Sequence, residues 1–471
     1  MKNAKKTIAI AGATGFVGTA LIDMLIEKHE IIGLTRSKEK ISNSNLNENI
    51  KWLSCDAFSL LSVNRVLKNV DCLIYLIHSM LPSSRLSQGT FRDLDLLIAD
   101  NFSNGVRYNN VKQIIYISGL MPKEDKISNT SNHLQSRYEV EQILSNSNAS
   151  LTTIRCGIIV GPGGSSLKIL VNLVRRLPLM GLPSWTNSIS QPISIRDVKI
   201  ALNCCLENDE KYRGSFDIGG PDVISYKKMM EITASVLKTK LLMFYVPFIP
   251  TSFSKRWVST FSGVSINLVS PLIDSLKHDL VASDNMLQKK ISENYISFKD
   301  SLKLSIDNYG LAIKNPRDKL REVDIKSIRK AKRVRSVQRL PLPRGKNAKW
   351  VAEEYLRWLP QTLKTIIRCD VKENKMVYFY LRLIAKPALI LMLEDESSDN
   401  YRILKIVGGM LVNTEKSKTG RLEFREILNG SCVIAAIHDY SPRLPWYVYN
   451  LSQAIVHLLV MKAFKNHLAG L

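Results

Sequence analysis

Several features that would define a class of protein are missing from this chain of 471 residues. No uninterrupted apolar run approaches the ~20 residues that a membrane-spanning helix needs. The seven cysteines are scattered and include no Cys-x-x-Cys pair, which argues against a disulfide framework or a zinc site and favours a reducing compartment. No helix-turn-helix or other nucleic-acid motif is evident. We therefore expect no metal site and no nucleic-acid partner.

Acidic side chains are fewer than basic ones. The chain has 42 Asp and Glu and 66 Lys and Arg, which gives a formal net charge of +24. Such an excess favours anionic partners such as nucleotide phosphates, nucleic acid or an acidic lipid surface. A basic, solvated surface is the simpler explanation on composition alone. We expect a cytoplasmic protein, with peripheral contact to an anionic membrane as an alternative.

The first half of the chain alternates apolar, β-branched runs with helical patterns, which indicates a parallel sheet with helices on both faces. The predicted strands are Thr7–Ala11, Ile31–Thr35, Ile50–Cys55, Asp71–Ile77, Val111–Ser118, Leu151–Ile159 and Ser215–Ile218. The predicted helices are Thr19–Lys28, Leu60–Leu67 and Leu94–Tyr108. The expected fold class is α/β, a Rossmann-like doubly wound sheet.

The later part of the chain has a different pattern. Leu241–Lys277 mixes apolar residues with prolines and basic residues; short helices that cap the substrate side are the simpler interpretation, and an interfacial patch on anionic lipid is the alternative. A basic linker is expected at residues 313–332. Strands are then predicted at Arg335–Leu340, Met376–Leu383, Ala388–Leu393, Tyr401–Leu411, Gly420–Leu428 and Cys432–Tyr440, and helices at Asn347–Trp358 and Trp446–Leu468.

This pattern predicts a second, α+β domain in which a curved antiparallel sheet wraps a helix. The spacing of Leu451, Ala454, Leu458 and Met461 predicts that they form the buried stripe of the closing helix. Arg421, Glu423 and Arg425 alternate along one strand; they could line a polar pocket, but cross-strand salt bridges are the simpler explanation.

The strongest local signal is a buried strand that runs into a glycine-rich turn and opens a helix, Ile8-Ala-Ile-Ala-Gly12-Ala-Thr-Gly15-Phe-Val-Gly18. Glycine allows a tight turn and a close approach of the backbone to a pyrophosphate, and the helix N-terminus offers free amides to the phosphates. This context favours a dinucleotide site. The residues expected to contact the cofactor there are Gly12, Thr14, Gly15, Phe16, Val17 and Gly18.

The residue at the end of the second strand normally decides which dinucleotide binds, because an acidic side chain there accepts from the ribose 2′-hydroxyl and repels a 2′-phosphate. Here Thr35 is followed by Arg36, Ser37 and Lys38, with no acid. Arg36 can pair with a phosphate, with Ser37 as a helper, so NADP(H) is favoured over NAD(H). Asp56, after the third strand, is either an acceptor for the adenine amino group or a turn residue.

These motifs, together with Arg155-Cys-Gly-Ile-Ile-Val-Gly-Pro-Gly163 and Phe216-Asp-Ile-Gly-Gly-Pro221, resemble the atypical and extended short-chain dehydrogenase/reductase superfamily. The resemblance is strongest to its NmrA-like NAD(P)H-binding members, related to the NADPH-binding subunit of complex I. It implies one domain over residues 1–312, with a substrate-side segment at about 157–312.

The C-terminal part has its own resemblance. Arg335-Ser-Val-Gln-Arg-Leu-Pro-Leu-Pro343, Gly420-Arg-Leu-Glu-Phe-Arg425, His438-Asp-Tyr440 and Leu444-Pro-Trp446 are similar to the DUF2867 domain. That resemblance implies a second domain over residues 333–471, which we expect to be similar to the helix-grip fold.

Active members of the superfamily carry a Ser after the fifth strand and a Tyr-x-x-x-Lys on the next helix, where Tyr is the acid/base and Lys lowers its pKa and holds the nicotinamide ribose. Ser118 fits the Ser, but His133 stands in place of Tyr and Arg137 in place of Lys. Arg137 could still bind the ribose, although a guanidinium stays charged and cannot relay protons. His133 could serve as acid/base.

Three functions of different classes follow. The favoured one is a dinucleotide-binding, redox-responsive module with little or no turnover. The first alternative is an NADPH-dependent oxidoreductase or epimerase-like enzyme that uses Ser118, His133 and Arg137. The second alternative is a membrane-surface protein whose C-terminal domain binds an apolar ligand.

Overall fold

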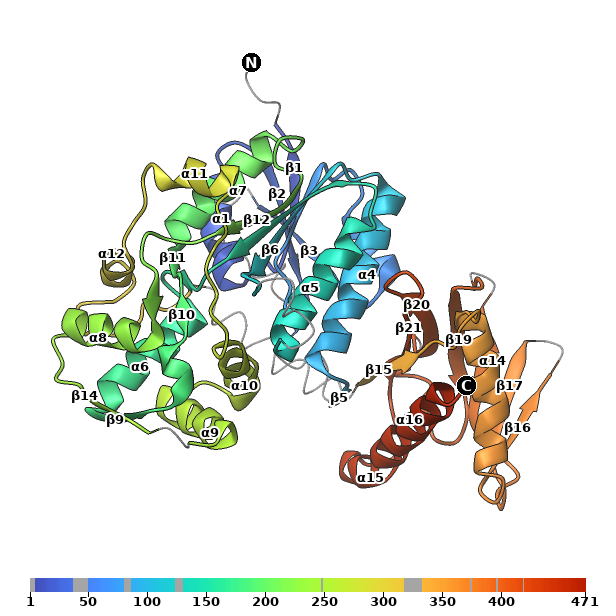
Figure 1. Cartoon of the computed structure of the whole chain (residues 1–471). Helices are drawn as coiled ribbons and strands as arrows, with labels where there is room; N and C mark the ends of the chain where they lie inside the picture. The colour runs from blue at the N-terminus through green and yellow to red at the C-terminus, as the bar shows by residue number, and fades with distance from the viewer. Residues whose placement is uncertain are drawn as a thin grey trace. The chain divides into compact units, whose positions relative to one another are not determined.

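The computed structural model describes residues 5–36, 50–79, 86–122, 130–246, 249–316, 333–372, 375–394, 397–417 and 419–471. The chain divides into two compact units (Figure 1). The N-terminal unit comprises Met1–Leu81 and Ile98–Val323, and the C-terminal unit comprises Pro82–Leu97 and Asp324–Leu471. Each unit has its own sheet and hydrophobic core.

The N-terminal unit is built on a sheet of seven parallel strands in the order β12-β7-β6-β4-β1-β2-β3. Its strands are β1 (Thr7–Ala11), β2 (Glu30–Thr35), β3 (Ile50–Ser54), β4 (Cys72–Tyr75), β6 (Gln113–Gly119), β7 (Ser150–Cys156) and β12 (Gly214–Ile218). The chain leaves the central strand β1 toward β2 and β3 and then returns to β4 on its other side. In folds of this class a ligand binds at such a reversal, outside the carboxyl ends of the strands, which here are those of β1 and β4. The predicted doubly wound fold is confirmed.

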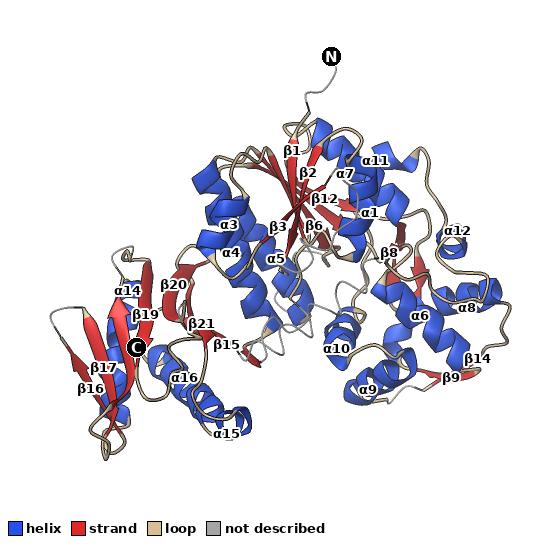
Figure 2. Cartoon of the chain, turned by 180° about the vertical axis from the view of Figure 1, so that it is seen from behind, coloured by secondary structure: helices blue, strands red, loops and turns tan. Residues whose placement is uncertain are grey.

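Helices cover both faces of this sheet (Figure 2). One face carries α1 (Phe16–Leu25), α7 (Ile195–Glu207) and α11 (Met286–Ser292), and the other carries α3 (Leu60–Val66), α4 (Phe91–Asn109) and α5 (Asn132–Ser145). The buried strands have no exposed face because each side packs against apolar helix residues such as Leu21, Val198 and Phe102. A strand buried on both faces reads as a continuous apolar run, which explains why the strand positions were predictable.

A second layer of the N-terminal unit follows β7 and packs around its own apolar core. Its helices are α6 (Ser165–Arg176), η2 (Ser184–Asn187), α8 (Tyr226–Leu237), α9 (Thr251–Ser262), α10 (Ile266–Ser275) and α12 (Phe298–Lys303). Its short strands are β8 (Ile159–Val160), β9 (Leu179–Leu182), β10 (Ile189–Ser190), β11 (Ile193–Ser194), β13 (Ile224–Ser225) and β14 (Leu242–Tyr245). The prediction of short helices within Leu241–Lys277 is confirmed by α9 and α10. Val258, Val269 and Ile273 of these helices are buried in the core of this layer.

The C-terminal unit contains an eight-stranded sheet in the order β16-β17-β18-β19-β20-β21-β15-β5. Its strands are β16 (Ile367–Val371), β17 (Met376–Leu381), β18 (Pro387–Leu393), β19 (Tyr401–Gly408), β20 (Arg421–Ile427), β21 (Cys432–Tyr440), β15 (Val334–Pro341) and β5 (Leu86–Gln88). Neighbouring strands from β16 to β15 are antiparallel, as expected for this domain. Helices α14 (Ala348–Thr362) and α16 (Gln453–Ala469) share one core with this sheet.

The strand β5 comes from the first half of the chain. It pairs in parallel with β15, with Leu86 opposite Val334 and Gln88 opposite Ser336. A salt bridge from Arg339 Nε to Asp93 Oδ1, 2.9 Å long, adds a second link between these two stretches of sequence. The sequence pattern gave no sign of this insertion of residues 82–97 into the C-terminal unit.

The predicted closing helix Trp446–Leu468 is broken at Ser452, whose φ of −125° and ψ of −89° are not helical. It therefore forms α15 (Trp446–Leu451) and α16. The break places Leu451 on α15, apart from the other members of the predicted buried stripe, and the stripe is wrong for two of its four members. Leu451 and Leu458 are exposed, whereas Ala454 and Met461 are buried together with two residues outside the prediction, Phe464 and Leu468.

Within the described ranges, no helix combines the length and the apolar character needed to cross a bilayer.

Candidate functional site

The glycine-rich turn follows β1 at the carboxyl edge of the parallel sheet. Gly12 has a φ of +99°, a backbone conformation that L side chains rarely adopt. The Gly15 amide donates to the Gly12 carbonyl at 2.9 Å, and Gly15 is the extended N-cap residue of α1. No side chain caps this helix, so the amides of its first turn are left for another acceptor.

The three glycines of the motif have different roles. A Cβ on Gly18 would lie 2.4 Å from the Gly12 carbonyl oxygen, so this glycine allows α1 to pack against the turn. A Cβ on Gly12 would lie 3.1 Å from the backbone of Leu76, which follows β4. A Cβ on Gly15 would meet only the Gly12 oxygen, at 3.2 Å. Gly15 is therefore the position whose missing side chain keeps the surface of the turn open.

The remaining predicted residues of the turn are half-buried. Thr14 lies in the turn itself, Val17 packs on the core beneath α1, and the ring of Phe16 lies against Gly161 and Gly164. The contact of Phe16 brings the first glycine motif next to the later Arg155–Gly163 motif. Two sequence motifs that are far apart therefore meet at one edge of the sheet.

The residues predicted to read the adenosine half follow β2 and β3. Arg36 is exposed directly after β2. Ser37 and Lys38 lie outside the described residues. Asp56 forms a turn after β3, in which Oδ1 accepts from the Phe58 amide at 3.1 Å while its own amide donates to Ser62 Oγ. The turn role is therefore present in the structure, and the adenine contact stays a prediction.

The three predicted catalytic residues lie on β6 and α5. Ser118 stands near the carboxyl end of β6, and its Oγ is buried without a hydrogen-bond partner among the described residues. His133, in the first turn of α5, has Nδ1 3.1 Å from Ser275 Oγ on α10. Arg137, one turn later, is buried and lies over the ring of Tyr116, with 5.8 Å between Cζ and the ring centroid.

His78, which the sequence analysis missed, connects these side chains. It follows β4, and its Nδ1 lies 3.0 Å from Nη2 of Arg137, whose Nη1 also donates to the Ile77 carbonyl at 3.4 Å. The His78 and His133 rings lie 5.0 Å apart between centroids. A polar residue directly after a buried strand was the available signal, because strand ends in this class of fold carry the ligand contacts.

The other face of α5 is held by a separate ion-pair network. Arg155 on β7 makes a bidentate pair with Glu141, with Nη2 to Oε1 at 2.8 Å and Nε to Oε2 at 3.1 Å. Asp217 on β12 lies 4.0 Å from the same guanidinium. This network fixes α5 against the sheet and so sets the direction in which His133 and Arg137 project.

Residues 12–172 match the NAD(P)H-binding domain family. The fold of the N-terminal unit resembles that of a nucleoside-diphosphate-sugar epimerase from Staphylococcus aureus, with a TM-score of 0.51 and 16% identity over 63% of this chain and 99% of the epimerase. A triphenylmethane reductase from Citrobacter sp., complexed with NADP(H), aligns with a TM-score of 0.49 and 16% identity over 63% of this chain and 99% of that chain.

One relative aligns with both units. Auxiliary protein GraX of Staphylococcus aureus is 19% identical over 461 residues, which cover 98% of this chain and 92% of that protein.

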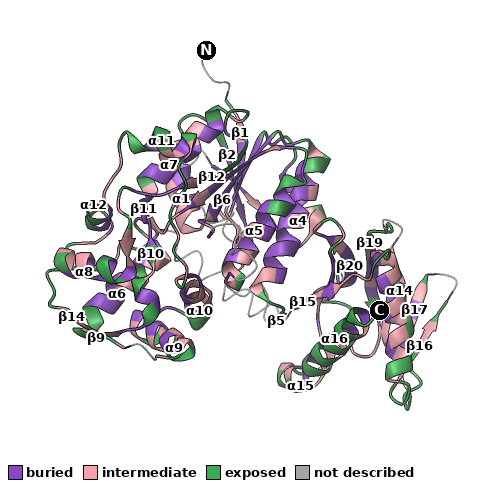
Figure 3. Ribbon diagram, in the orientation of Figure 1, coloured by how far each residue is buried: buried purple, intermediate pink, exposed green. Residues whose placement is uncertain are grey.

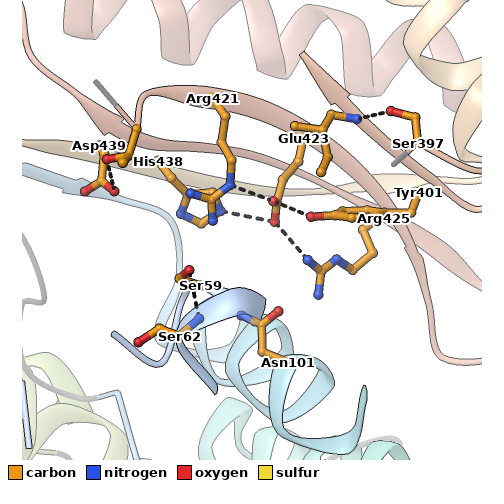
Figure 4. A network of polar contacts seen from close by, with 12 residues as sticks. Ser59, Ser62, Asn101, Ser397, Tyr401, Arg421, Glu423, Arg425, His438 and Asp439 are labelled. Carbon is orange, nitrogen blue, oxygen red and sulfur yellow. Dashed lines mark hydrogen bonds and ion pairs between the residues drawn. The ribbon is translucent and has the colours of Figure 1, made fainter. Parts of the chain in front are cut away.

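The C-terminal unit has a buried polar cluster on β20 and its neighbours (Figure 4). Glu423 is fully buried and receives Arg421 Nε at 3.2 Å, Arg425 Nη2 at 3.4 Å, His438 Nε2 at 3.1 Å and Tyr401 Oη at 3.1 Å. Burial opposes ionisation of Glu423, but Arg425, His438 and Arg421 outweigh it and hold its pKa well below the usual range. Ion pairs were the expected arrangement, although both arginines lie on the same strand as Glu423 rather than across from it.

The described residues contain no group of three or more His, Cys, Asp or Glu side chains that is placed to hold a metal ion.

Proposed function

We propose that this protein binds NADP(H) at the Gly12–Gly18 turn and acts as a dinucleotide-responsive module rather than as an efficient dehydrogenase. The preference for NADP(H) is supported by Arg36, which follows β2 where an acid would select NAD(H). A guanidinium at this position can make charge-assisted hydrogen bonds to a 2′-phosphate.

The observation that carries the proposal is that Arg137 is buried and hydrogen-bonded to other residues of the protein. Its guanidinium is buried against Tyr116 and bonded to Ile77 and His78, and no ordinary pH removes its charge. It therefore cannot pass a proton onward from an acid/base residue, as the usual lysine arrangement requires. His133 is likewise engaged with Ser275, a residue of the protein itself.

The relative that spans both units, GraX, is named an auxiliary protein, which agrees with a role in sensing or assembly rather than turnover. In such a role the bound dinucleotide would change the stability or the partners of the protein. We also propose that the C-terminal unit is a DUF2867-like domain.

A second function is favoured by one observation. Ser118 Oγ is a buried hydroxyl without a hydrogen-bond partner in the described part of the chain, and a carbonyl or hydroxyl of a substrate would satisfy it. That would fit an NADPH-dependent oxidoreductase or epimerase-like enzyme with His133 as acid/base.

One experiment separates the two functions. The purified full-length protein is titrated with NADPH and with NADH, with cofactor fluorescence as the readout, and the loaded protein is then followed for oxidation at 340 nm with a panel of carbonyl compounds. Saturable NADPH binding with no oxidation above the buffer rate supports the module. Equal affinity for both cofactors would contradict the NADP(H) preference, and rapid oxidation would establish the enzyme.

A further inference from the structure

The C-terminal unit contains a cavity of about 400 Å³. This volume lies within the ~300–1,000 Å³ that is typical of small-molecule sites. Its walls come from the sheet, α14, α15, α16 and the segment between the last two helices. Its lining residues include Gln88, Ser336, Val456 and His457.

The chemistry of this lining is uniform over most of the cavity. Leucine, isoleucine, valine and aromatic side chains predominate, and no Asp, Glu, Lys or Arg is among them. Water in such a space finds few partners, whereas an apolar molecule gains dispersion contacts on every side. The cavity therefore suits a ligand with a long apolar part.

Three polar lining residues, Gln88, Ser336 and His457, lie where β5, β15 and α16 meet. Gln88 is 6% exposed; its Nε2 donates to the Ala454 carbonyl at 2.8 Å, and its Oε1 is buried without a partner among the described residues. Opposite Gln88 on β15, Ser336 Oγ lies 2.9 Å from Nε2 of His457. Burial lowers the pKa of His457 to about 4, so its ring is neutral near pH 7. This end of the cavity is polar but uncharged, and it has a free acceptor.

The cavity reaches the surface through α16. Val456 lines the cavity and is nevertheless 54% exposed, so the wall is a single side chain thick at this point. Exposed apolar residues adjoin it on the same pair of helices, which are largely exposed in Figure 3; these are Tyr447, Leu451, Ile455, Leu458 and Leu459. An apolar rim of this kind is suited to the passage of an apolar molecule.

We propose that this cavity binds an uncharged single-chain lipid that carries a hydroxyl group, of the class of monoacylglycerols and long-chain alcohols. The chain lies among the apolar side chains, and the hydroxyl donates to Gln88 Oε1. A fatty-acid anion fits less well, because its carboxylate would be buried with no cation in the lining. The inference goes beyond dinucleotide binding and stands on the C-terminal unit alone.

The test uses the delipidated full-length protein at pH 7.5, titrated with 1-monooleoylglycerol, methyl oleate and oleate below their aggregation thresholds, with displacement of an environment-sensitive fluorophore as the readout. We expect one saturable site for 1-monooleoylglycerol. Methyl oleate, which lacks the hydroxyl donor, should bind about fivefold more weakly, as befits one neutral hydrogen bond. Oleate should bind at least about tenfold more weakly because of its unpaired charge.

Two matched variants locate the site on α16. Val456→Trp should block the cavity and lower affinity for 1-monooleoylglycerol, whereas Val407→Trp, the same change at an exposed valine of β19 outside the lining and the rim, should leave it unchanged. Gln88→Leu should remove the preference for 1-monooleoylglycerol over methyl oleate; thermal melting of each variant confirms that it is folded. The proposal is overturned if the folded, intact protein shows no saturable binding of 1-monooleoylglycerol, if oleate binds more tightly, or if both tryptophan variants lose affinity equally.

Discussion

Nη2 of Arg137 lies 3.0 Å from Nδ1 of His78. Because a guanidinium carries only donors, Nδ1 of His78 accepts this bond, and a neutral His78 ring then has its proton on Nε2. Arg137 is thus bonded to a residue that follows β4, near the carboxyl ends of the strands where we expect the dinucleotide to bind. This pairing is the structural basis for expecting cofactor binding with little turnover, and the following predictions test its parts.

Gly15→Val should abolish NADPH binding while the protein remains folded. Gly15 has φ −78° and ψ 175°, an extended conformation that valine adopts readily, so the added side chain should cover the turn without breaking it. Fluorescence titration measures binding, and circular dichroism checks the fold. Gly470→Ala, at the C-terminus of α16 where a Cβ has room, is the control. Undiminished affinity in folded Gly15→Val would refute the assignment of the turn.

Arg36→Asp should weaken NADPH binding about tenfold or more and leave NADH binding nearly unchanged, because a charge-assisted hydrogen bond contributes ~1.5–3 kcal/mol. Arg213→Asp makes the same change of net charge at an exposed residue before the amino end of β12, the opposite edge of the sheet. Titrations of both variants with NADPH separate the loss of a specific contact from the electrostatic effect of a changed net charge. An equal loss in both would mean that Arg36 contributes only through net charge.

His133→Ala should change neither NADPH affinity nor any rate of NADPH oxidation. The lost hydrogen bond to Ser275 should cost about 1 kcal/mol of stability at most. If His133 were the general acid, the same change would lower turnover about 10²–10⁴-fold. Steady-state assays compare the intact protein with the variant. NADPH oxidation that the intact protein catalyses and the variant does not would establish the catalytic role of His133.

Phe464→Ala should destabilise the C-terminal unit by about 3–5 kcal/mol, the usual cost of removing a buried aromatic ring. Phe464 is fully buried, with ring centroids 5.1 Å from both Tyr355 and Trp358. Leu459→Ala, on the exposed side of the same helix, should cost little. Urea unfolding monitored by tryptophan fluorescence compares the two; similar midpoints would show that α16 does not contribute to the core.

His457 should make the protein less stable as the pH falls from about 6.5 to about 4. In the unfolded chain the imidazole binds a proton below its ordinary pKa of ~6.5, whereas burial lowers the pKa of His457 to about 4 in the folded protein, so acid favours unfolding. The full difference approaches about 3 kcal/mol. Urea midpoints at pH 7.5 and 5.0 should therefore differ less in His457→Asn than in the intact protein. Equal pH dependence in both would show that other groups, such as His29 and His438, account for it.

The sequence by itself determined the elements whose signals are local. Thr7–Ala11 is a strand in the prediction and in the structure, because a continuous apolar run and obligatory glycines are visible over a few residues. The helix after the glycine turn was also predicted, although α1 spans Phe16–Leu25 rather than Thr19–Lys28. Asn347 caps α14 through Oδ1 to the Trp350 amide, which a preference for short polar residues at helix starts makes predictable.

Tertiary structure alone decided the features that depend on distant partners. The three-residue β5 has too little pattern to be recognised and exists as a strand because β15 offers it hydrogen bonds. The break at Ser452 separates Leu451 from α16, and within α16 His457 rather than Leu458 lines the cavity, which the apolar spacing does not predict. His78 and Arg137 are 59 residues apart and meet only because β4 and α5 approach one another in the fold. Local propensity acts over a few residues, whereas pairing, helix phase and side-chain contacts are fixed by the free energy of the packed chain.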